Sequence, residues 1–243
     1  MERASKILGI STDTLSKAKQ VVDYGNQKLI EEMDETGNVN KVYGEWRRLK
    51  RIDERRDVTL PKGKYNVLYA DPPWTYGDKL TESFPAVHHY YPTMTIEEIA
   101  EYTDSLGKQI KDLTTKNAVL FLWVTSPLLE ECFSVIEAWG FKYKTSYIWD
   151  KMRSMWGHYS SPRHEFLIVC LRGSFLPESK KLPESVISIK RIGRHSEKPV
   201  YFRDEIIEKM YPHGKWIELF ARYDKEKREE LEKRGWILWG TEV

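Results

Sequence analysis

Apolar and polar positions change their pattern near residue 58 of the 243-residue chain. Residues 1–58 show the three-to-four-residue spacing of apolar positions that is typical of amphipathic helices, with frequent charges and few β-branched residues. From residue 59 onward, short apolar runs alternate with helical patterns. The pattern therefore predicts two parts, a helical segment over 1–58 and an α/β domain over 59–243.

Seven apolar runs in the second part predict strands at Asn66–Ala70, Ala118–Val124, Thr145–Trp149, Glu165–Leu171, Val186–Ile189, Trp216–Phe220 and Trp236–Trp239. Helices are expected at about 95–112, 127–139, 199–210 and 224–234. Nearly continuous apolar strands between amphipathic helices are typical of a mostly parallel sheet covered on both faces. Ligands of such sheets bind outside the carboxyl ends of the strands.

The N-terminal segment opens with a run, ASKILGISTDTLSKAK, that is typical of a helix-turn-helix. Ala4 and Leu8 would pack inside, Gly9 would form the turn, and Ser11 or Thr12 would cap the second helix. Two further expectations are that this helix runs through about Met33 and that another spans Val39–Ile52. DNA reading and a purely structural helical cap both stay open for this segment.

Composition indicates a globular protein with a real core, since 40% of residues are hydrophobic and 31% are charged. No apolar run approaches the roughly 20 residues that a membrane span needs, and no secretory signal is visible at the N-terminus. Cys132 and Cys170 lie in apolar contexts, so we expect two buried thiols and a reducing, cytoplasmic location.

Charge is unevenly distributed, although the net charge is only +2. Residues 41–64 contain nine Lys or Arg and four Asp or Glu, and residues 172–198 contain seven Lys or Arg and three Asp or Glu. Such stretches can hold a phosphate backbone, and they can equally be solvated helix faces. The aromatic content of 13% suits both a core and the stacking of bases.

Asp71-Pro72-Pro73-Trp74 leaves the carboxyl end of the apolar run NVLYA. Two prolines stiffen the loop, and Pro72 forces Asp71 into an extended conformation. The Asp71 carboxylate and the Pro72 carbonyl can each accept one N–H of an exocyclic adenine amine, which points the nitrogen lone pair at an electrophilic methyl group. Trp74 can stack on a base that has left the helix. The alternative, an Asp that caps a helix beside a proline turn, does not account for the Trp or for the strand end.

Further motifs accompany this corner in a fixed order: YYPTMT at 90–95, LFLWVT at 120–125, YIW at 147–149, HEFLIV at 164–169, RHSEKP at 194–199, IELFAR at 217–222 and WILWGTE at 236–242. The set resembles the MT-A70 family, named after the catalytic subunit of the eukaryotic mRNA adenosine methyltransferase. The resemblance covers about residues 64–243. It implies a Rossmann-like methyltransferase fold in permuted order, with the catalytic loop before the cofactor strand, and S-adenosylmethionine as cofactor.

The resemblance also implies a role for individual residues. Catalytic roles fall on Asp71, Pro72, Pro73 and Trp74. Cofactor contacts fall on Asp71, Lys198, Glu218, Leu219, Phe220, Arg222, Thr241 and Glu242. Substrate contacts fall on Trp74, Tyr91, Trp123 and His164.

Several of these residues have a structural alternative. Glu218 lies in an apolar strand, where an unpaired carboxylate is expensive, so a ligand or an internal cation must satisfy it; we favour the ligand. Lys198 can be a surface lysine or can project its charge into the cleft, and a strand residue such as Trp123 is usually core. His164 and His195 lack partners at metal-ligand spacing, so we expect no metal site.

The chain departs from the family pattern in two places. Thr241 stands where an asparagine commonly contacts the cofactor ribose, and Thr reaches less far. Tyr223-Asp224-Lys225 follows IELFAR where the mRNA branch has His-Asn, so those contacts do not transfer. Neither change touches the Asp71–Trp74 corner.

We therefore expect a methyltransferase acting on the 6-amino nitrogen of adenine in DNA, of bacterial or phage type. The compact length and the helix-turn-helix-like start favour DNA over RNA as substrate. Two alternatives stay open, the same reaction on RNA and an inactive nucleic-acid-binding subunit. Asp71 argues against the latter, because inactive subunits tend to lose the catalytic acid. No membrane association is expected; a homodimer or a methyltransferase-like partner subunit stays open.

Overall fold

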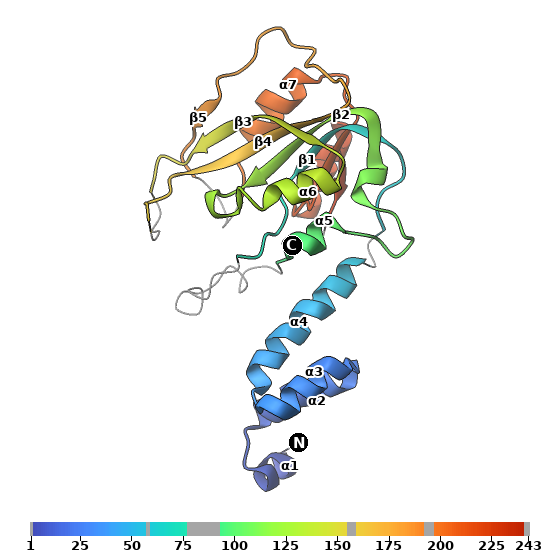
Figure 1. Cartoon of the computed structure of the whole chain (residues 1–243), viewed down its shortest axis with the longest axis vertical. Coiled ribbons are helices and arrows are strands. Elements are labelled where there is room, and N and C mark those ends of the chain that lie inside the picture. The colour runs from blue at the N-terminus through green and yellow to red at the C-terminus, as the bar shows by residue number, and fades with distance from the viewer. Residues whose placement is uncertain (1, 57–58, 77–92, 155–158, 192–196, 241–243) are drawn as a thin grey trace. The chain divides into compact units, whose positions relative to one another are not determined.

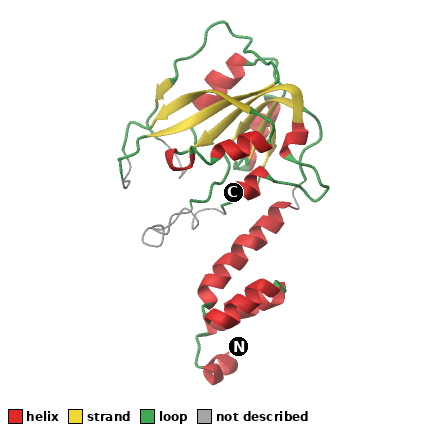
Figure 2. Ribbon diagram, in the orientation of Figure 1, coloured by secondary structure: helices red, strands yellow, loops and turns green. Residues whose placement is uncertain are grey.

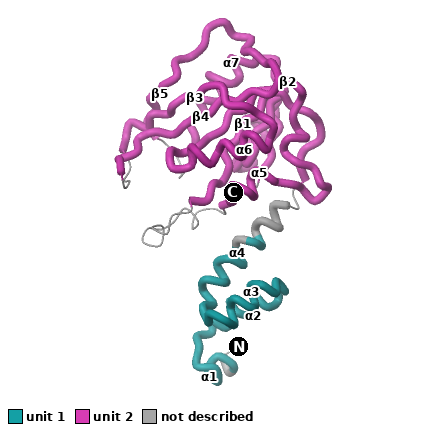
Figure 3. The backbone as a smooth tube through the Cα atoms, viewed as in Figure 1, with its two compact units in different colours: residues 1–55 teal, residues 56–243 magenta. Residues whose placement is uncertain are grey.

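The computed structural model describes residues 2–56, 59–76, 93–154, 159–191 and 197–240 (Figure 1). It divides into two compact units, residues 1–55 and residues 56–243 (Figure 3). None of the described helices is both long and apolar enough to cross a bilayer.

The described residues of the first unit form helices: α1 (Glu2–Leu8), α2 (Thr12–Tyr24), α3 (Gln27–Thr36) and all but the last residue of α4 (Val39–Arg56). Ser11 caps α2 by accepting the Thr14 N–H at 3.0 Å. Gly25 ends α2 in the left-handed conformation (φ 76°), and the Asn26 side chain begins α3 by accepting the Leu29 N–H. The predicted continuous helix through Met33 is therefore wrong, because a C-cap and an N-cap stand next to each other.

A small core holds this unit together. Val21, Leu29, Val42 and Trp46 are buried, and Tyr43 stacks on Trp46 with ring centroids 4.9 Å apart. The expected inward packing of Ala4 and Leu8 is also wrong: both are exposed, Leu8 to 61%. Helix α1 is only seven residues long, and the core lies on α2, α3 and α4 instead.

The second unit is a seven-stranded sheet with helices on both faces (Figure 2). Its strands are β1 (Tyr65–Ala70), β2 (Thr114–Val124), β3 (Lys142–Asp150), β4 (His164–Arg172), β5 (Val186–Ser188), β6 (Trp216–Leu219) and β7 (Ile237–Trp239). The order in space is β5-β3-β4-β2-β1-β6-β7. β4 runs antiparallel to β2 and β3, and every other neighbouring pair is parallel. The predicted mostly parallel sheet is confirmed, with one reversed strand.

Side chains of the central strands point alternately to two cores. On one face, Leu68 and Ala70 of β1 pack with α6 (Cys132–Ala138) and α5 (Ile96–Ala100). On the other face, Val67 and Tyr69 pack with the segment after residue 200 and with α8 (Lys225–Lys233). Asp71 therefore follows a strand that is covered on both sides.

The helix expected over 95–112 is two short elements, α5 and the 3₁₀-helix η3 (Ile110–Leu113). Asp104 breaks the helical path, because its carboxylate accepts the backbone N–H groups of Leu60, Leu106 and Lys108. A second prediction, 127–139, is likewise divided into η4 (Ser126–Leu128) and α6. A side-chain acceptor such as Asp104 competes with helix formation in this way.

The helix expected at 199–210 contains an unusual turn. Phe202–Ile207 form a π-helix, η5, which continues into α7 (Glu208–Met210). Phe202, Arg203, Ile206 and Ile207 of this turn are buried. Short π-helical turns are rare and often accompany functional sites.

Both cysteines are buried and free, as expected. Burial raises the pKa of the Cys132 thiol to about 11 and that of Cys170 to about 12. These thiols serve as core residues.

Candidate active site at the carboxyl edge of the sheet

The Asp71–Trp74 corner is held in one shape by backbone hydrogen bonds. The Trp74 N–H donates to the Pro72 carbonyl at 2.9 Å. Met94 pairs with this loop: its N–H donates to the Pro73 carbonyl at 2.7 Å, and its carbonyl accepts the Thr75 N–H at 2.9 Å. A carbonyl oxygen has two lone pairs, so the Pro72 oxygen that accepts Trp74 can accept a second donor.

Trp74 is nearly buried, with 5% of its surface exposed. Its indole N–H donates to the Trp123 carbonyl at 2.9 Å, which ties the corner to the end of β2. Trp123 is itself 1% exposed, and its indole N–H donates to the Tyr69 hydroxyl at 2.7 Å. The two tryptophans thus form a fixed wall.

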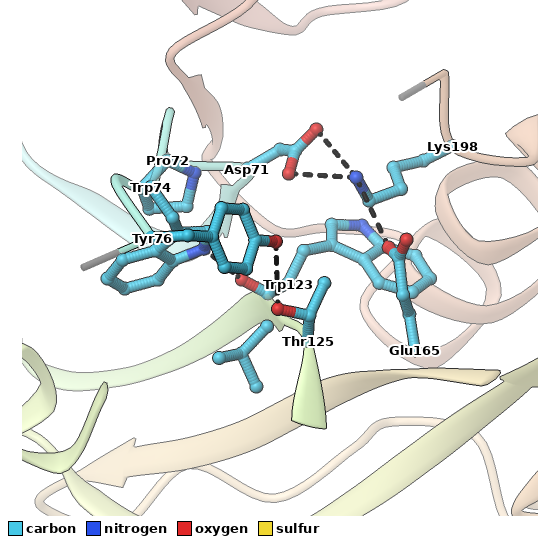
Figure 4. Close-up of a pocket in the computed structure, with 9 residues that line it drawn as sticks. Asp71, Pro72, Trp74, Tyr76, Trp123, Thr125, Glu165 and Lys198 are labelled. Carbon is cyan, nitrogen blue, oxygen red and sulfur yellow. Dashed lines mark hydrogen bonds and ion pairs between the residues drawn. The ribbon is translucent and has the colours of Figure 1, made fainter. Parts of the chain in front are cut away.

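A pocket opens beside the corner (Figure 4). Its lining comes from the ends of β1 and β2, the start of β4 and the residues before η5: Asp71, Pro72, Trp74, Tyr76, Trp123, Val124, Thr125, Glu165 and Lys198. The structure thereby brings together five of the predicted site residues, Asp71, Pro72, Trp74, Trp123 and Lys198. Glu165, Tyr76 and Thr125 were not predicted; the Tyr76 and Thr125 hydroxyls lie 2.9 Å apart.

Asp71 contacts two cations. The Lys198 ammonium lies 3.0 Å from both carboxylate oxygens, and the Arg222 guanidinium lies 3.3 Å from Oδ2. Lys198 also lies over the Trp123 ring, 5.5 Å from its centroid. Burial alone would lower the pKa of Lys198, but Asp71 and Glu165 more than offset it and raise that pKa. Lys198 is therefore a charged residue of the pocket and does not lie on the surface.

Glu165 is buried between two lysines. Its Oε1 accepts from Lys151 at 2.5 Å and its Oε2 lies 3.3 Å from Lys198. Burial would raise the pKa of this carboxyl, but the ammonium groups of Lys198 and Lys151 outweigh burial and hold the pKa below its usual range. A glutamate at the start of an otherwise apolar strand is the signal that could have identified it in the sequence.

Glu218 lies on β6, outside the lining of this pocket, and is 5% exposed. Its Oε1 accepts from the Tyr223 hydroxyl at 2.8 Å, and its Oε2 lies 3.7 Å from Nη1 of the buried Arg203. Oε2 has no hydrogen-bond partner among the described residues. Burial raises the pKa of Glu218 to about 7, and Asp71 adds to the rise against the opposing effects of Arg203 and Tyr223. An internal cation, Arg203, thus lies near Glu218 but does not form a hydrogen bond with Oε2.

The residues after Glu218 form a tight, strained corner. Phe220 has a left-handed backbone (φ 62°), which is unusual for a residue with a side chain. It packs against Trp139 and Trp239, and Leu219 is fully buried. Gly240 lies so close that an added Cβ would be 2.3 Å from the Ala221 carbonyl oxygen, so only glycine fits there.

Of the remaining predicted residues, His164 is half-buried next to Glu165, and its Nε2 lies 3.3 Å from the Ser126 hydroxyl. It does not line the pocket. Tyr91, Thr241, Glu242 and His195 lie outside the described residues.

Comparisons with known proteins agree with this architecture. The model of the MT-A70 family matches residues 65–242. Type II methyltransferase M.MunI of Mycoplasma sp. is 34% identical over 202 residues, which cover 76% of this chain and 80% of that protein. The N(6)-adenosine-methyltransferase catalytic subunit METTL3 of Homo sapiens is 28% identical over 177 residues, 68% of this chain but 27% of that protein. A putative N(6)-adenosine-methyltransferase MT-A70-like protein of Medicago truncatula is 27% identical over 192 residues, 74% of this chain and 27% of that protein.

The sheet and the acidic-proline corner at its edge define a Rossmann-like methyltransferase. The match over residues 65–242 is more specific, and the chain belongs to the MT-A70 family. It spans most of the Mycoplasma relative but only 27% of the human and Medicago proteins.

Proposed function

We propose that this methyltransferase transfers the methyl group of S-adenosylmethionine to the 6-amino nitrogen of adenine in DNA. One observation supports it above the others: the Asp71 carboxylate and the Pro72 carbonyl stand together at a pocket beside a buried tryptophan wall. DNA is favoured by which relatives match over most of their length. The relative named Type II methyltransferase M.MunI is covered over 80% of its length. The two N(6)-adenosine-methyltransferase relatives are each covered over only 27% of theirs.

Asp71 and Pro72 would align the amine. An adenine amine is a weak nucleophile, because its lone pair is delocalised into the ring. Two acceptors at fixed positions draw its two N–H groups in and direct the lone pair toward the methyl donor. Alignment of this kind accounts for about 7–11 kcal/mol of a barrier in favourable cases. The proton leaves after attack, since the methylated amine is acidic, so no histidine base is needed.

Trp74 would support the base. With the indole N–H fixed on the Trp123 carbonyl, the ring cannot rotate away from the pocket. Stacking on such a ring is worth about 1–3 kcal/mol per base. The base must leave the duplex or come from a single strand to reach it.

The cofactor would supply an electrophilic methyl group on a sulfonium. Glu218 fits its ribose, because the buried Oε2 lacks a hydrogen-bond donor among the described residues and two hydroxyls would provide one. Lys198 fits its carboxylate, and Arg222 lies beside the same corner. Leu219 and Phe220 would shape this part of the site, with Thr241 and Glu242 assigned by the family pattern alone.

The helix-turn-helix role of residues 1–58 also stays a proposal. A three-residue turn, Gly9 to Ser11, joins α1 to a capped α2, which supports it. The small core on α2, α3 and α4 supports the alternative, a purely structural role for this segment, equally well.

Methyl transfer to matched DNA and RNA oligonucleotides, single- and double-stranded, tests the proposal. We expect label from the cofactor in DNA, at the adenine N6 position. Label in RNA alone would establish the adenosine chemistry of the plant and animal relatives instead. Calorimetry with S-adenosylmethionine completes the test, because a pure protein that fails to bind it, with and without nucleic acid, is an inactive subunit.

A further inference from the structure

Lys151 is a buried lysine behind the pocket. It directly follows β3, and its backbone N–H donates to the Arg163 carbonyl at 2.9 Å, which fixes its position. Only 9% of its surface is exposed, and its ammonium lies 5.2 Å from the centroid of the Trp149 ring. A buried ammonium is expensive unless it is paired, and Lys151 forms an ion pair with Glu165.

Glu165 divides its two oxygens between two lysines. Oε1 is occupied by Lys151 at 2.5 Å, which leaves Oε2 for Lys198 at 3.3 Å. Lys198 in turn lies closer to Asp71, at 3.0 Å. Charges of alternating sign thus follow one another from Lys151 through Glu165 and Lys198 to Asp71.

We propose that Lys151 is a positioning residue that acts through Glu165 to keep Lys198 at the reaction centre. The positive charge of Lys151 balances much of the negative charge of Glu165. This prevents the Glu165 carboxylate from drawing Lys198 away from Asp71 and from the cofactor carboxylate. The inference rests on the proposed function. Without Lys151, a buried anion would have Lys198 as its remaining close cation, and their attraction would strengthen accordingly.

Lys151→Met tests the role, since methionine keeps an unbranched side chain of similar length, one atom shorter, and removes the charge. We expect S-adenosylmethionine to bind about tenfold more weakly, an effect of the size usual for coupled neighbours. Lys151→Arg retains the charge and should stay within about threefold of the wild type. Lys142→Met is the matched control, because Lys142 is exposed at the opposite end of β3, and should not change the affinity.

A double variant shows whether the effect passes through Glu165. In Lys151→Met/Glu165→Gln the uncompensated anion is gone, so we expect cofactor affinity to recover most of the loss seen in Lys151→Met. Recovery of affinity supports the proposal, because a purely packing role for Lys151 would not respond to the charge of Glu165. A double variant that binds no better than Lys151→Met overturns it.

Failure of this inference and failure of the proposed function are distinguishable. A wild type that binds the cofactor and methylates DNA, with Lys151→Met unchanged in affinity, overturns the role of Lys151 alone. A wild type that does not bind the cofactor overturns the proposed function, and the role of Lys151 with it.

Discussion

Glu165 and Glu218 are both buried carboxylates of the central sheet, and they differ in the cations that face them. Glu165 has two lysines at 2.5 and 3.3 Å, and its pKa is lowered. Glu218 has one arginine at 3.7 Å and one phenol, and its pKa is raised to about 7. Burial acts on both alike, so the number and the distance of the cations decide the charge. Glu165 is therefore ionised at neutral pH, whereas Glu218 changes its charge there.

Asp71 interacts with both, because it shares Lys198 with Glu165 and raises the pKa of Glu218, and its removal gives the largest expected effect. Asp71→Asn keeps the shape of the side chain but loses the charge and one acceptor. We expect turnover to fall by more than about a thousandfold, as for other groups aligned with a transition state. Cofactor affinity should stay within about tenfold. Single-turnover kinetics and calorimetry check both values, and intact turnover would remove Asp71 from the mechanism.

Neutralisation should destabilise the protein much more at Glu165 than at Glu218. Glu165→Gln leaves the buried Lys151 without its carboxylate and removes one of the two carboxylates that face Lys198, so it should cost about 3 kcal/mol of unfolding free energy at pH 8. Glu218→Gln removes an ionised carboxyl that burial disfavours, so its cost should be below about 1 kcal/mol. Urea unfolding of both variants measures the difference. Equal losses would show that the two sites do not differ as described.

The pH dependence of stability follows from the raised pKa of Glu218. Between the unfolded value of 4.5 and the folded value of about 7, the native state binds more protons than the unfolded state. The contribution of this group to stability is therefore present at low pH and is lost as pH rises through about 7. Glu218→Gln should lack that decline, which unfolding curves between pH 5 and pH 8 would reveal as a different slope.

Cofactor affinity should depend on pH for the same reason. If the ionised Glu218 accepts the ribose hydroxyls, affinity rises about tenfold between roughly pH 6 and pH 8. Glu165 stays ionised over that range and contributes no such change. Calorimetry across the range, with Glu218→Gln as the control, makes the measurement. A flat profile for the wild type would assign the ribose to another group.

The smallest expected effect concerns Tyr223, which donates to Glu218 at 2.8 Å. Tyr223→Phe removes one hydrogen bond to the ionised form, worth about 1 kcal/mol. The pKa of Glu218 should therefore rise further, and the midpoint of the cofactor-affinity profile should move to higher pH. A midpoint that does not move would mean that the phenol does not favour the ionised carboxyl.

Much of the fold was predictable, because strands buried on both faces leave long apolar runs. All seven predicted strands are present, with boundaries that differ by a few residues. Two helices, the one expected over 95–112 and the one expected to run through about Met33, were mispredicted where polar side chains accept backbone N–H groups: Asp104 in the first and Asn26 in the second. Such local hydrogen bonds leave no trace in hydrophobic periodicity.

The candidate site was predictable only where a motif follows a strand end. Asp71 met that condition, while Lys198 came from resemblance to the family. Glu165 was missed because β4 runs antiparallel to β2 and β3, so the start of β4 lies at the edge of the sheet where those two strands end. Lys151 was missed because nothing in a single lysine after a strand indicates burial.

The π-helical turn η5 (Phe202–Ile207) lies between Lys198 and helix α7. Such a turn contains more residues than an α-helical one. The turn therefore accommodates one extra residue, and loss of that residue would restore a regular α-helical turn while the later side chains keep their faces. Loss of one residue at this point is therefore a change that the fold can absorb, because Met210 would keep its place in the core against the sheet.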